Sequence, residues 1–223
     1  MTDTLQAIGQ ALSNDVRTLT TISHNVANIS TPGYRGVRTV PQFDAAAGLS
    51  EVTVLRDGGL AQTARPMDLA LQGSGFFTVE RDGQVLLVRA GAFRVDRDGW
   101  LVTAAGDRVL GTSGPIAMPA GDVRVDADGA LRQGTQALGQ LQLVTVADAA
   151  QLRPAGAGAF AFDGALVPAQ AQVVQGALER SNVEPADEML RLMETTRHAE
   201  SVQRAMSMYD KAMDVGINKL GEN

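Results

Sequence analysis

Both ends of the chain carry apolar residues at the three- and four-residue spacing of amphipathic helices, and this pattern constrains the fold most. The N-terminal repeat comprises Leu5, Ile8, Leu12, Leu19, Ile22, Val26 and Ile29. Asp15 alone interrupts this repeat. The C-terminal repeat comprises Leu192, Ala199, Val202, Met206, Tyr209, Met213 and Leu220. A single narrow apolar stripe is typical of a coiled-coil seam. We therefore expect helices within residues 1–33 and 178–223 that pair as a coiled coil.

Local signals mark where these helices begin and end. Pro32 disfavours helix at the residue before it and Gly33 permits a turn, so the first helix should end near Asn28. Pro185 suits the first turn of the second helix, and nearby acids favour its positive end. One face of that helix alternates in charge, and we interpret this face as solvated; it comprises Glu188, Arg191, Glu194, Arg197, Glu200 and Arg204.

Between the helices the pattern changes to short β-type runs separated by glycine turns. The expected strands cover residues 51–55, 76–80, 85–89, 92–95, 100–103, 122–125, 140–146 and 172–175. Asp-Gly pairs, which favour tight hairpin turns, stand at 57–58, 82–83, 98–99, 128–129 and 163–164. The sequence therefore predicts an α+β protein, with an extended connector at 34–66 and an inserted antiparallel β domain at 67–177.

Composition excludes several classes of function. The net charge of -6 argues against a nucleic-acid partner, which would favour a basic face. No apolar run approaches the length of a membrane span, so we expect no direct membrane insertion. The absence of Cys rules out disulfides and thiol chemistry. The polar start of the chain lacks the features of a cleaved signal peptide, and we expect none.

Each candidate catalytic or metal-binding motif in the sequence is explained better by an ordinary structural role. The two histidines are His24 and His198, and Ser23 cannot face its neighbour His24 on a helix. Residues 96–99 and 126–129 lack the glycine position and the bidentate Glu of a calcium loop. Residues 73–75 are followed by a strand-like run instead of the helix of a phosphate loop. We expect no catalytic residues, no metal, no cofactor and no small-molecule substrate.

Four blocks of the sequence together resemble the bacterial flagellar rod and hook proteins. The first block runs from Ser23 through Asn25-Val26-Ala27-Asn28 and Thr31-Pro32-Gly33 to Tyr34-Arg35. Residues 72–79 resemble the family's glycine-rich entry into the β domain, and residues 89–103 resemble its next hairpin. Glu179-Arg180-Ser181-Asn182-Val183 resembles the signature before the last helix. The short connector and residues 64–71 resemble the proximal-rod subgroup.

This resemblance implies a structural subunit of the flagellar basal-body rod, placed in the periplasm after type III export. Its implied partners are other rod subunits, copies of itself and the flagellar export apparatus, in a helical assembly that transmits motor torque to the hook. The expected assembly interface comprises Leu5, Ile8, Leu12, Leu19, Ile22, Asn25, Val26, Asn28, Leu192, Val202, Met206, Tyr209, Met213 and Leu220. Pro32, Gly33 and Tyr34 are the expected hinge.

Alternatives remain open at the level of sequence. Asn25 and Asn28 could instead satisfy backbone groups at the end of the helix. The turn at Pro32 could be a plain chain reversal. The chain could also be a distal-rod or hook subunit, or a β-domain binding protein with helical oligomerisation arms. A carboxylate hydrolase would require a deep pocket with two close carboxylates.

Overall fold

The computed structural model describes residues 2–41 and 48–221, with side chains described for residues 5–41 and 48–213. Within it the chain forms two compact units. The helical unit consists of residues 1–27, 37–52 and 184–223, and the β unit consists of residues 28–36 and 53–183. The two units therefore interleave along the sequence, and each is held together by segments that are far apart in the chain.

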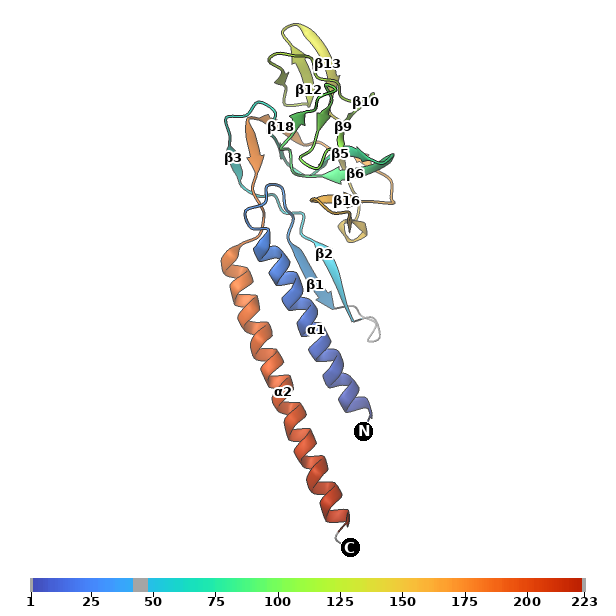
Figure 1. The fold of residues 1–223 in the computed structure, drawn as a ribbon, viewed down its shortest axis with the longest axis vertical. Helices are drawn as coiled ribbons and strands as arrows, with labels where there is room; N and C mark the ends of the chain where they lie inside the picture. Colours follow the sequence, from blue (N-terminus) through green and yellow to red (C-terminus); the bar gives the residue numbers. More distant parts are fainter. Residues whose placement is uncertain (1, 42–47, 222–223) are drawn as a thin grey trace. The chain divides into compact units, whose positions relative to one another are not determined.

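The helical unit contains two long helices and a two-stranded sheet. Helix α1 (Thr2–Ala27) and helix α2 (Pro185–Gly221) lie side by side and contact each other (Figure 1). Strand β1 (Val37–Pro41) pairs with β2 (Leu49–Thr53), and β1 also packs against α1. The chain is thus α+β, as its sequence predicts.

The helix boundaries follow the local signals. Helix α1 ends at Ala27, and the backbone N–H of Thr31 then donates to the carbonyl of Asn28 in a turn. Pro185 is the first residue of α2, where its missing N–H costs nothing. The expected C-terminal helical segment, residues 178–223, is helical only from residue 185. Residues 177–179, at its start, pair as a strand with residues 60–62.

The β unit consists of short strands. They are β3 (Leu60–Gln62), β4 (Leu69–Gln72), β5 (Phe76–Arg81), β6 (Gln84–Val88), β7 (Arg94–Val95), β8 (Leu101–Val102), β9 (Arg108–Gly111), β10 (Gly114–Pro115), β11 (Arg124–Val125), β12 (Ala130–Gln133), β13 (Gln136–Gln140), β14 (Leu143–Thr145), β15 (Arg153–Pro154), β16 (Ala159–Ala161), β17 (Val167–Pro168), β18 (Gln172–Gln175) and β19 (Ala177–Glu179). A 3-10 helix, Ala149–Gln151, precedes β15.

These strands pair antiparallel in four sheets. The largest has the order β15-β16-β6-β5-β9-β8-β7, with β10 beside β9 and with β14 between β5 and β17. Strands β11, β12 and β13 form a second sheet. Two sheets close the unit across a long stretch of sequence, because β18 pairs with β4 and β19 pairs with β3.

The Asp-Gly pairs behave differently from one another. Asp82 and Gly83 both have positive φ, 51° and 77°, in the two-residue turn between β5 and β6, as a tight hairpin requires. In the β7–β8 and β11–β12 hairpins only Gly99 and Gly129 have positive φ. The pairs at 57–58 and 163–164 lie outside hairpins. Three of the five predicted turns therefore join neighbouring strands.

The expected strands are confirmed in part. Strand β18 has the predicted bounds, and β5 and β6 agree to within a residue. The predicted run 140–146 is split between the end of β13 and β14. The connector at 34–66 holds more structure than its sequence shows, because β1, β2 and β3 lie in it. Strands β1 and β3 are too short or too polar to be visible as alternating runs.

The β unit has a fully buried apolar core. Leu69, Phe77, Val79, Leu101 and Leu131 are completely inaccessible to solvent. Phe77 and Phe93 meet edge to face, with ring centroids 5.1 Å apart. A smaller cluster around Phe76, Leu87 and Phe160 packs beside this core. Residues 2–41 and 48–221 include no helix that is both long and apolar enough to cross a membrane.

Candidate functional site

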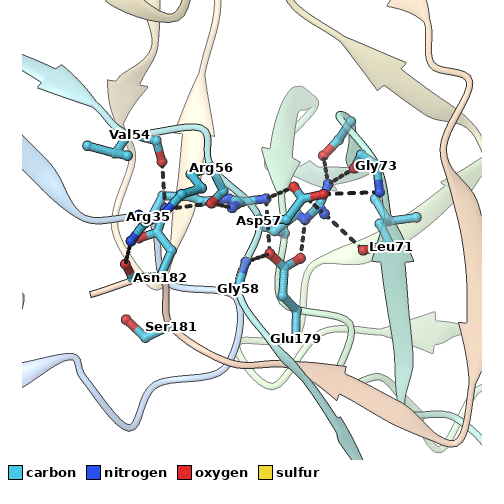
Figure 2. Close-up of polar contacts among 12 residues, drawn as sticks. Arg35, Val54, Arg56, Asp57, Gly58, Leu71, Gly73, Glu179, Ser181 and Asn182 are labelled. Atoms are coloured by element: carbon cyan, nitrogen blue, oxygen red, sulfur yellow. Dashed lines mark hydrogen bonds and ion pairs between the residues drawn. The ribbon is translucent and has the colours of Figure 1, made fainter. Parts of the chain in front are cut away.

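The most elaborate polar arrangement in the β unit is a cluster of two arginines and two carboxylates. Arg35 follows the turn after α1, Asp57 lies between β2 and β3, Arg89 follows β6, and Glu179 ends β19 (Figure 2). We call these four residues the arginine–carboxylate cluster. Arg35, Arg89 and Glu179 are buried, whereas the side chain of Asp57 is 42% exposed. Two positive and two negative charges balance within the cluster, so both buried arginines have carboxylate partners.

Arg89 is the centre of this cluster and has no exposed surface. Its Nε–H donates to Glu179, and its two terminal nitrogens donate to Asp57 at 3.1 Å and to three backbone carbonyls. The carbonyl acceptors, at 2.6–2.9 Å, belong to Leu71, Gly73 and Gly75. A guanidinium group has five N–H donors, and each of these five contacts uses one. Arg89 therefore fixes the glycine-rich segment before β5 to the end of the unit's last strand.

Arg35 binds the same two carboxylates from the other side. Its Nη2 lies 3.1 Å from Glu179 Oε1 and 3.2 Å from Asp57 Oδ1, and Nη1 donates to the carbonyl of Arg56. Burial lowers the pKa of the Arg35 guanidinium, and the charge of Arg89 lowers it further, whereas Glu179 raises it. A guanidinium remains protonated in proteins, so this burial must be offset by the two carboxylates.

Glu179 and Asp57 also accept backbone hydrogen bonds. Glu179 Oε1 accepts from the N–H of Gly58 at 2.7 Å, and Asp57 Oδ2 accepts from the N–H of Gly73 at 3.1 Å. Gly58 is required at its position, because a Cβ there would lie 2.0 Å from the carbonyl oxygen of Arg180. The cluster thus joins segments from the beginning, the middle and the end of the β unit.

Asn182 makes a second joint beside the cluster. Its Oδ1 accepts from the N–H of Gly36 at 2.7 Å, and its Nδ2 donates to the carbonyls of Val54 and Arg56 at 2.8 and 2.7 Å (Figure 2). Gly33 is held near by, since its N–H donates to the carbonyl of Glu179 at 2.8 Å. Its φ of 67° and its close approach to Ala90 both require glycine. The expected hinge residues around Gly33 therefore lie within the β unit and are anchored there.

The segments that contain the cluster residues and Asn182 stand out in the sequence, but the hydrogen bonds and ion pairs between them do not. Arg35, Gly73, Arg89, Glu179 and Asn182 all belong to the four blocks quoted above. Their pairing was missed because no local spacing reports which charges meet across the fold. The clearest signal available in the sequence was Arg89, a single charged residue inside an otherwise apolar and glycine-containing segment.

The structure leaves most of the expected assembly residues of α1 accessible. Leu5 and Val26 are exposed, at 45% and 48%, and Ile8, Leu12 and Leu19 are partly buried. Ile22 and Asn25 are buried. The Asn25 amide forms two hydrogen bonds of 2.9 Å with the backbone of Val37 in β1, one as donor and one as acceptor. Asn25 therefore satisfies backbone groups of strand β1 and not those at the end of its own helix.

The remaining expected residues are distributed over α2 and the turn after α1. Leu192 and Met206 are both 42% exposed, and Val202, Tyr209 and Met213 are partly buried. Leu220 lies outside the residues whose side chains are described. Asn28 Oδ1 accepts from the hydroxyl of Thr31 at 3.1 Å, and Pro32 is exposed.

Glu188 differs from the expectation for the charged face of α2. It was expected to be solvated, yet it is 1% exposed and lies 3.1 Å from Arg38 of β1. The prediction was wrong at this residue because Arg38 of β1 meets Glu188 in the first turn of α2, a contact that the periodicity of a helix cannot show. Arg191, Glu194, Arg197, Glu200 and Arg204 are exposed, as expected.

The candidate catalytic groups occupy structural positions. The hydroxyl of Ser23 donates to the carbonyl of Leu19 at 2.8 Å. Asp96 Oδ1 accepts from two backbone N–H groups in the β7–β8 turn, those of Asp98 and Trp100. Among the residues that the structure describes, no three His, Asp or Glu side chains are grouped so as to hold a metal ion.

A groove of about 490 Å³ at the β5–β6 hairpin contains Glu80, Asp82 and Asp107. Both oxygens of Asp107 accept from Arg81 at 2.7 Å, and this pairing lowers the pKa of Asp107. Asp107 is therefore held as an anion and is unsuited to act as a general acid at neutral pH. A larger groove, about 720 Å³, is lined by four glutamines, with Asp128 as the single carboxylate among its lining residues.

The fold and the arginine–carboxylate cluster define a structural protein: a β body joined by internal ion pairs, with two long helices that keep much of their apolar surface accessible. Comparison with known proteins agrees with this class. Residues 70–133 match the D1 domain of the flagellar hook protein FlgE/F/G family, and residues 174–220 match the C-terminal region of the flagellar basal body rod FlgEFG proteins.

Named relatives cover nearly the whole chain. The flagellar basal-body rod protein FlgF of Caulobacter vibrioides is 33% identical over 92% of this chain and 93% of its own length. FlgF of Salmonella typhimurium is 30% identical over 84% of this chain and 86% of its own length. The rod protein FlgG of Agrobacterium fabrum is 30% identical over 88% of this chain and 91% of its own length.

The chain therefore belongs to the flagellar rod and hook family. It is a structural subunit of the flagellar basal-body rod and not an enzyme, since the relatives that it resembles over most of their length are rod proteins. This membership sets aside the alternative of a non-flagellar binding protein.

Proposed function

We propose that this chain is a proximal-rod subunit whose terminal helices form a coiled-coil inner layer with other rod subunits and with copies of itself. The assembly transmits torque from the motor to the hook. The similarity to FlgF rod proteins over most of both chains supports the choice of the proximal rod.

The observation that carries the proposal is the accessibility of the apolar seams. Leu5, Val26, Leu192 and Met206 each remain more than two-fifths exposed. Apolar surface of this kind is removed from water when further helices pack against it, and its burial drives association. The β unit also leaves four large apolar side chains exposed, Leu60, Val85, Val95 and Val167, but unlike the helical unit it has a core of completely inaccessible apolar side chains.

The composition of α2 fits contacts with several different neighbours. Met189, Met193, Met206 and Met208 are all exposed. Methionine is flexible and polarisable, so one surface can pack against differently shaped partners. A rod grows by heterologous contacts that do not close into a ring, and a single subunit in it meets neighbours of more than one kind.

We propose that the subunit reaches the periplasm unfolded, through the flagellar type III export apparatus. A chain without cysteine can complete its fold after export without any oxidation step. We also propose that Pro32, Gly33 and Tyr34 form the hinge after α1. The hydrogen bond from the N–H of Gly33 to the carbonyl of Glu179 fixes one end of this hinge.

Substitution within the α1 seam tests the proposal directly. Replacing Leu12 or Leu19 with Asp places a charge in the expected interface, and swimming should be lost while the soluble protein stays at its normal level. The matched control is Ser13→Asp, which adds the same charge at an exposed neighbouring position. Normal swimming with Leu12→Asp would show that this seam is not an assembly surface.

Quantitative mass spectrometry of purified hook–basal bodies tests the position in the rod. A proximal-rod subunit should be present in few copies per particle, whereas a copy number equal to that of the hook protein would place the chain in the hook. Deletion of the last ten residues should remove the subunit from the particles and leave the Trp100 fluorescence of the purified, truncated chain unchanged. A normal rod after this deletion would contradict the role of the C-terminal helix.

A further inference from the structure

The N-terminal apolar repeat contains one acid, Asp15, and the structure buries it. Asp15 is 8% exposed on α1, on the same side as Ile22 and between the seam residues Leu12 and Leu19. A carboxylate at such a position is unfavourable unless a partner compensates it. The role of the rod subunit as described so far does not use this residue.

The partner of Asp15 is His198 on α2. The Nδ1 atom of His198 lies 2.9 Å from both carboxylate oxygens of Asp15, within hydrogen-bond distance of each. The imidazole ring itself remains 59% exposed. The contact therefore joins a buried carboxylate of one helix to a half-solvated base of the other.

A second contact between a buried carboxylate and a basic side chain lies nearer the start of α2. Glu188 of α2 is buried, and its Oε1 lies 3.1 Å from Nη1 of Arg38 in β1, the strand that packs against α1. Glu188 and His198 are ten residues apart, which corresponds to about 15 Å along a helix. Helix α2 is thus attached at two separated points to α1 and to the strand beside it.

The apolar residues between α1 and α2 do little to specify how the two helices are aligned along their length. The residues that share the two seams are apolar and recur every seven residues, as Leu5, Leu12, Leu19 and Val26 do. A shift of one repeat would replace apolar side chains by apolar side chains. Polar residues at single seam positions are the known means by which helix pairs specify one register.

A shift of α2 by seven residues in either direction would break at least one of the two contacts. In one direction Ala205 would replace His198 opposite Asp15, and Asp15 would be buried without a base. In the other direction Arg191 would reach Asp15, but position 181 would come opposite Arg38, and position 181 precedes α2. The first contact therefore excludes one shift, and the second excludes the other.

We propose that Asp15–His198, together with Glu188–Arg38, fixes the register of α2 against α1. Asp15 and His198 are positioning residues: they select one alignment among those that the apolar seams allow. The inference concerns the single chain and does not depend on its place in the rod.

Distance measurement between spin labels on the full chain tests this proposal. The chain has no native cysteine, so Thr20→Cys and Ser207→Cys, both at exposed positions, provide the only labelling sites. We expect one distance population for this labelled chain. The added pair of substitutions Asp15→Leu and His198→Leu should produce a second population displaced by about 10 Å, the length of one seven-residue repeat.

Two further variants keep the test decisive. Glu194→Leu with Arg197→Leu removes one acid and one base from the exposed face of α2, and should leave the single distance unchanged. Exchange of the pair, Asp15→His with His198→Asp, should also retain the single distance. A single distance at the original value in the Asp15→Leu, His198→Leu chain would overturn the proposal and assign the register to apolar packing and chain connections.

If the double leucine chain does not fold, the single variant His198→Leu decides the question. It leaves Asp15 buried without a base, and we expect it to lose helical circular dichroism that the exchanged pair restores. Full helical signal together with an unchanged single distance in His198→Leu would equally overturn the proposal.

Discussion

The β unit and the helical unit treat apolar side chains in opposite ways. In the β unit, Leu101 and Leu131 are completely inaccessible, and Phe77 and Phe93 interlock edge to face. In the helical unit, Met189 and Leu190 at the start of α2 are 64% and 60% exposed. A unit with a closed core holds its own shape, whereas a unit with accessible seams gains stability from further partners.

The polar side chains of the two units also differ, because those of the β unit form a connected cluster and those of the helical unit form separate pairs. The arginine–carboxylate cluster uses every N–H of Arg89 and joins segments from the whole β unit. The helical unit instead has isolated contacts, such as Asp15–His198, each of which joins two elements. We infer that the cluster secures a finished fold, and that the isolated contacts select one arrangement among several of similar apolar packing.

The largest expected effect is on the cluster itself. Glu179→Ala should leave Arg35 and Arg89 buried without their shared carboxylate and destabilise the β unit by about 3–5 kcal/mol. Fluorescence of Trp100, the only tryptophan, reports unfolding of the β unit, and helical circular dichroism reports the other unit. As a control, Asp122→Ala removes an exposed acid of the β unit and should have little effect. Equal stability of both variants would contradict a structural role for the cluster.

Leucine truncation compares the two kinds of apolar position. Leu131→Ala, at a fully buried site, should lower the free energy of unfolding of the β unit by about 2–5 kcal/mol. Leu192→Ala, at a site that is 42% exposed, should change the stability of the free chain by less than about 0.5 kcal/mol. Urea unfolding followed by both signals measures this difference. A large loss for Leu192→Ala would mean that the seam is already closed within one chain.

Glycine-to-alanine substitution should have opposite signs in the two units. A Cβ at Gly91 would lie 1.7 Å from the carbonyl oxygen of Leu69, so Gly91→Ala should destabilise the β unit by about 1–3 kcal/mol. Gly9 lies inside α1 with nothing near its Cβ position, so Gly9→Ala should stabilise the helix by about 0.5–1 kcal/mol. Thermal unfolding of the two variants provides the test, and the same sign for both would contradict this contrast.

The smallest expected effect concerns the Arg81–Asp107 ion pair. Because Arg81 lowers the pKa of Asp107 in the folded chain, the pair stabilises the β unit above the ordinary carboxyl pKa of 3.8. This contribution is lost as the pH falls through the lowered value. Asp107→Asn should therefore reduce stability at pH 7, and its difference from the unmodified chain should shrink in acid.

Urea unfolding at neutral and at acid pH measures this change for Asp107→Asn. The control is Asp98→Asn, an exposed turn residue, for which we expect no comparable dependence on pH. A difference between Asp107→Asn and the unmodified chain that stays constant down to strong acid would exclude the ion pair as its cause.

Features that depend on neighbouring residues could be predicted from the sequence. The seven-residue repeats predicted both helices, Pro185 marked the start of α2, and Asp82-Gly83 marked a tight hairpin. The four blocks of sequence also indicated the family. These features could be predicted because the geometry of helices and tight turns repeats within a few residues.

Which distant groups meet depends on the tertiary fold and could not be predicted from the sequence. Gly36 and Asn182 are 146 residues apart in the chain and joined by a hydrogen bond, and Arg89 reaches Glu179 across 90 residues. Glu188 was expected to be solvated, yet it is buried and lies 3.1 Å from Arg38 of β1. Local spacing carries no information about such contacts. They form because the pairing of strands and the packing of helices bring polar and charged groups from distant segments together.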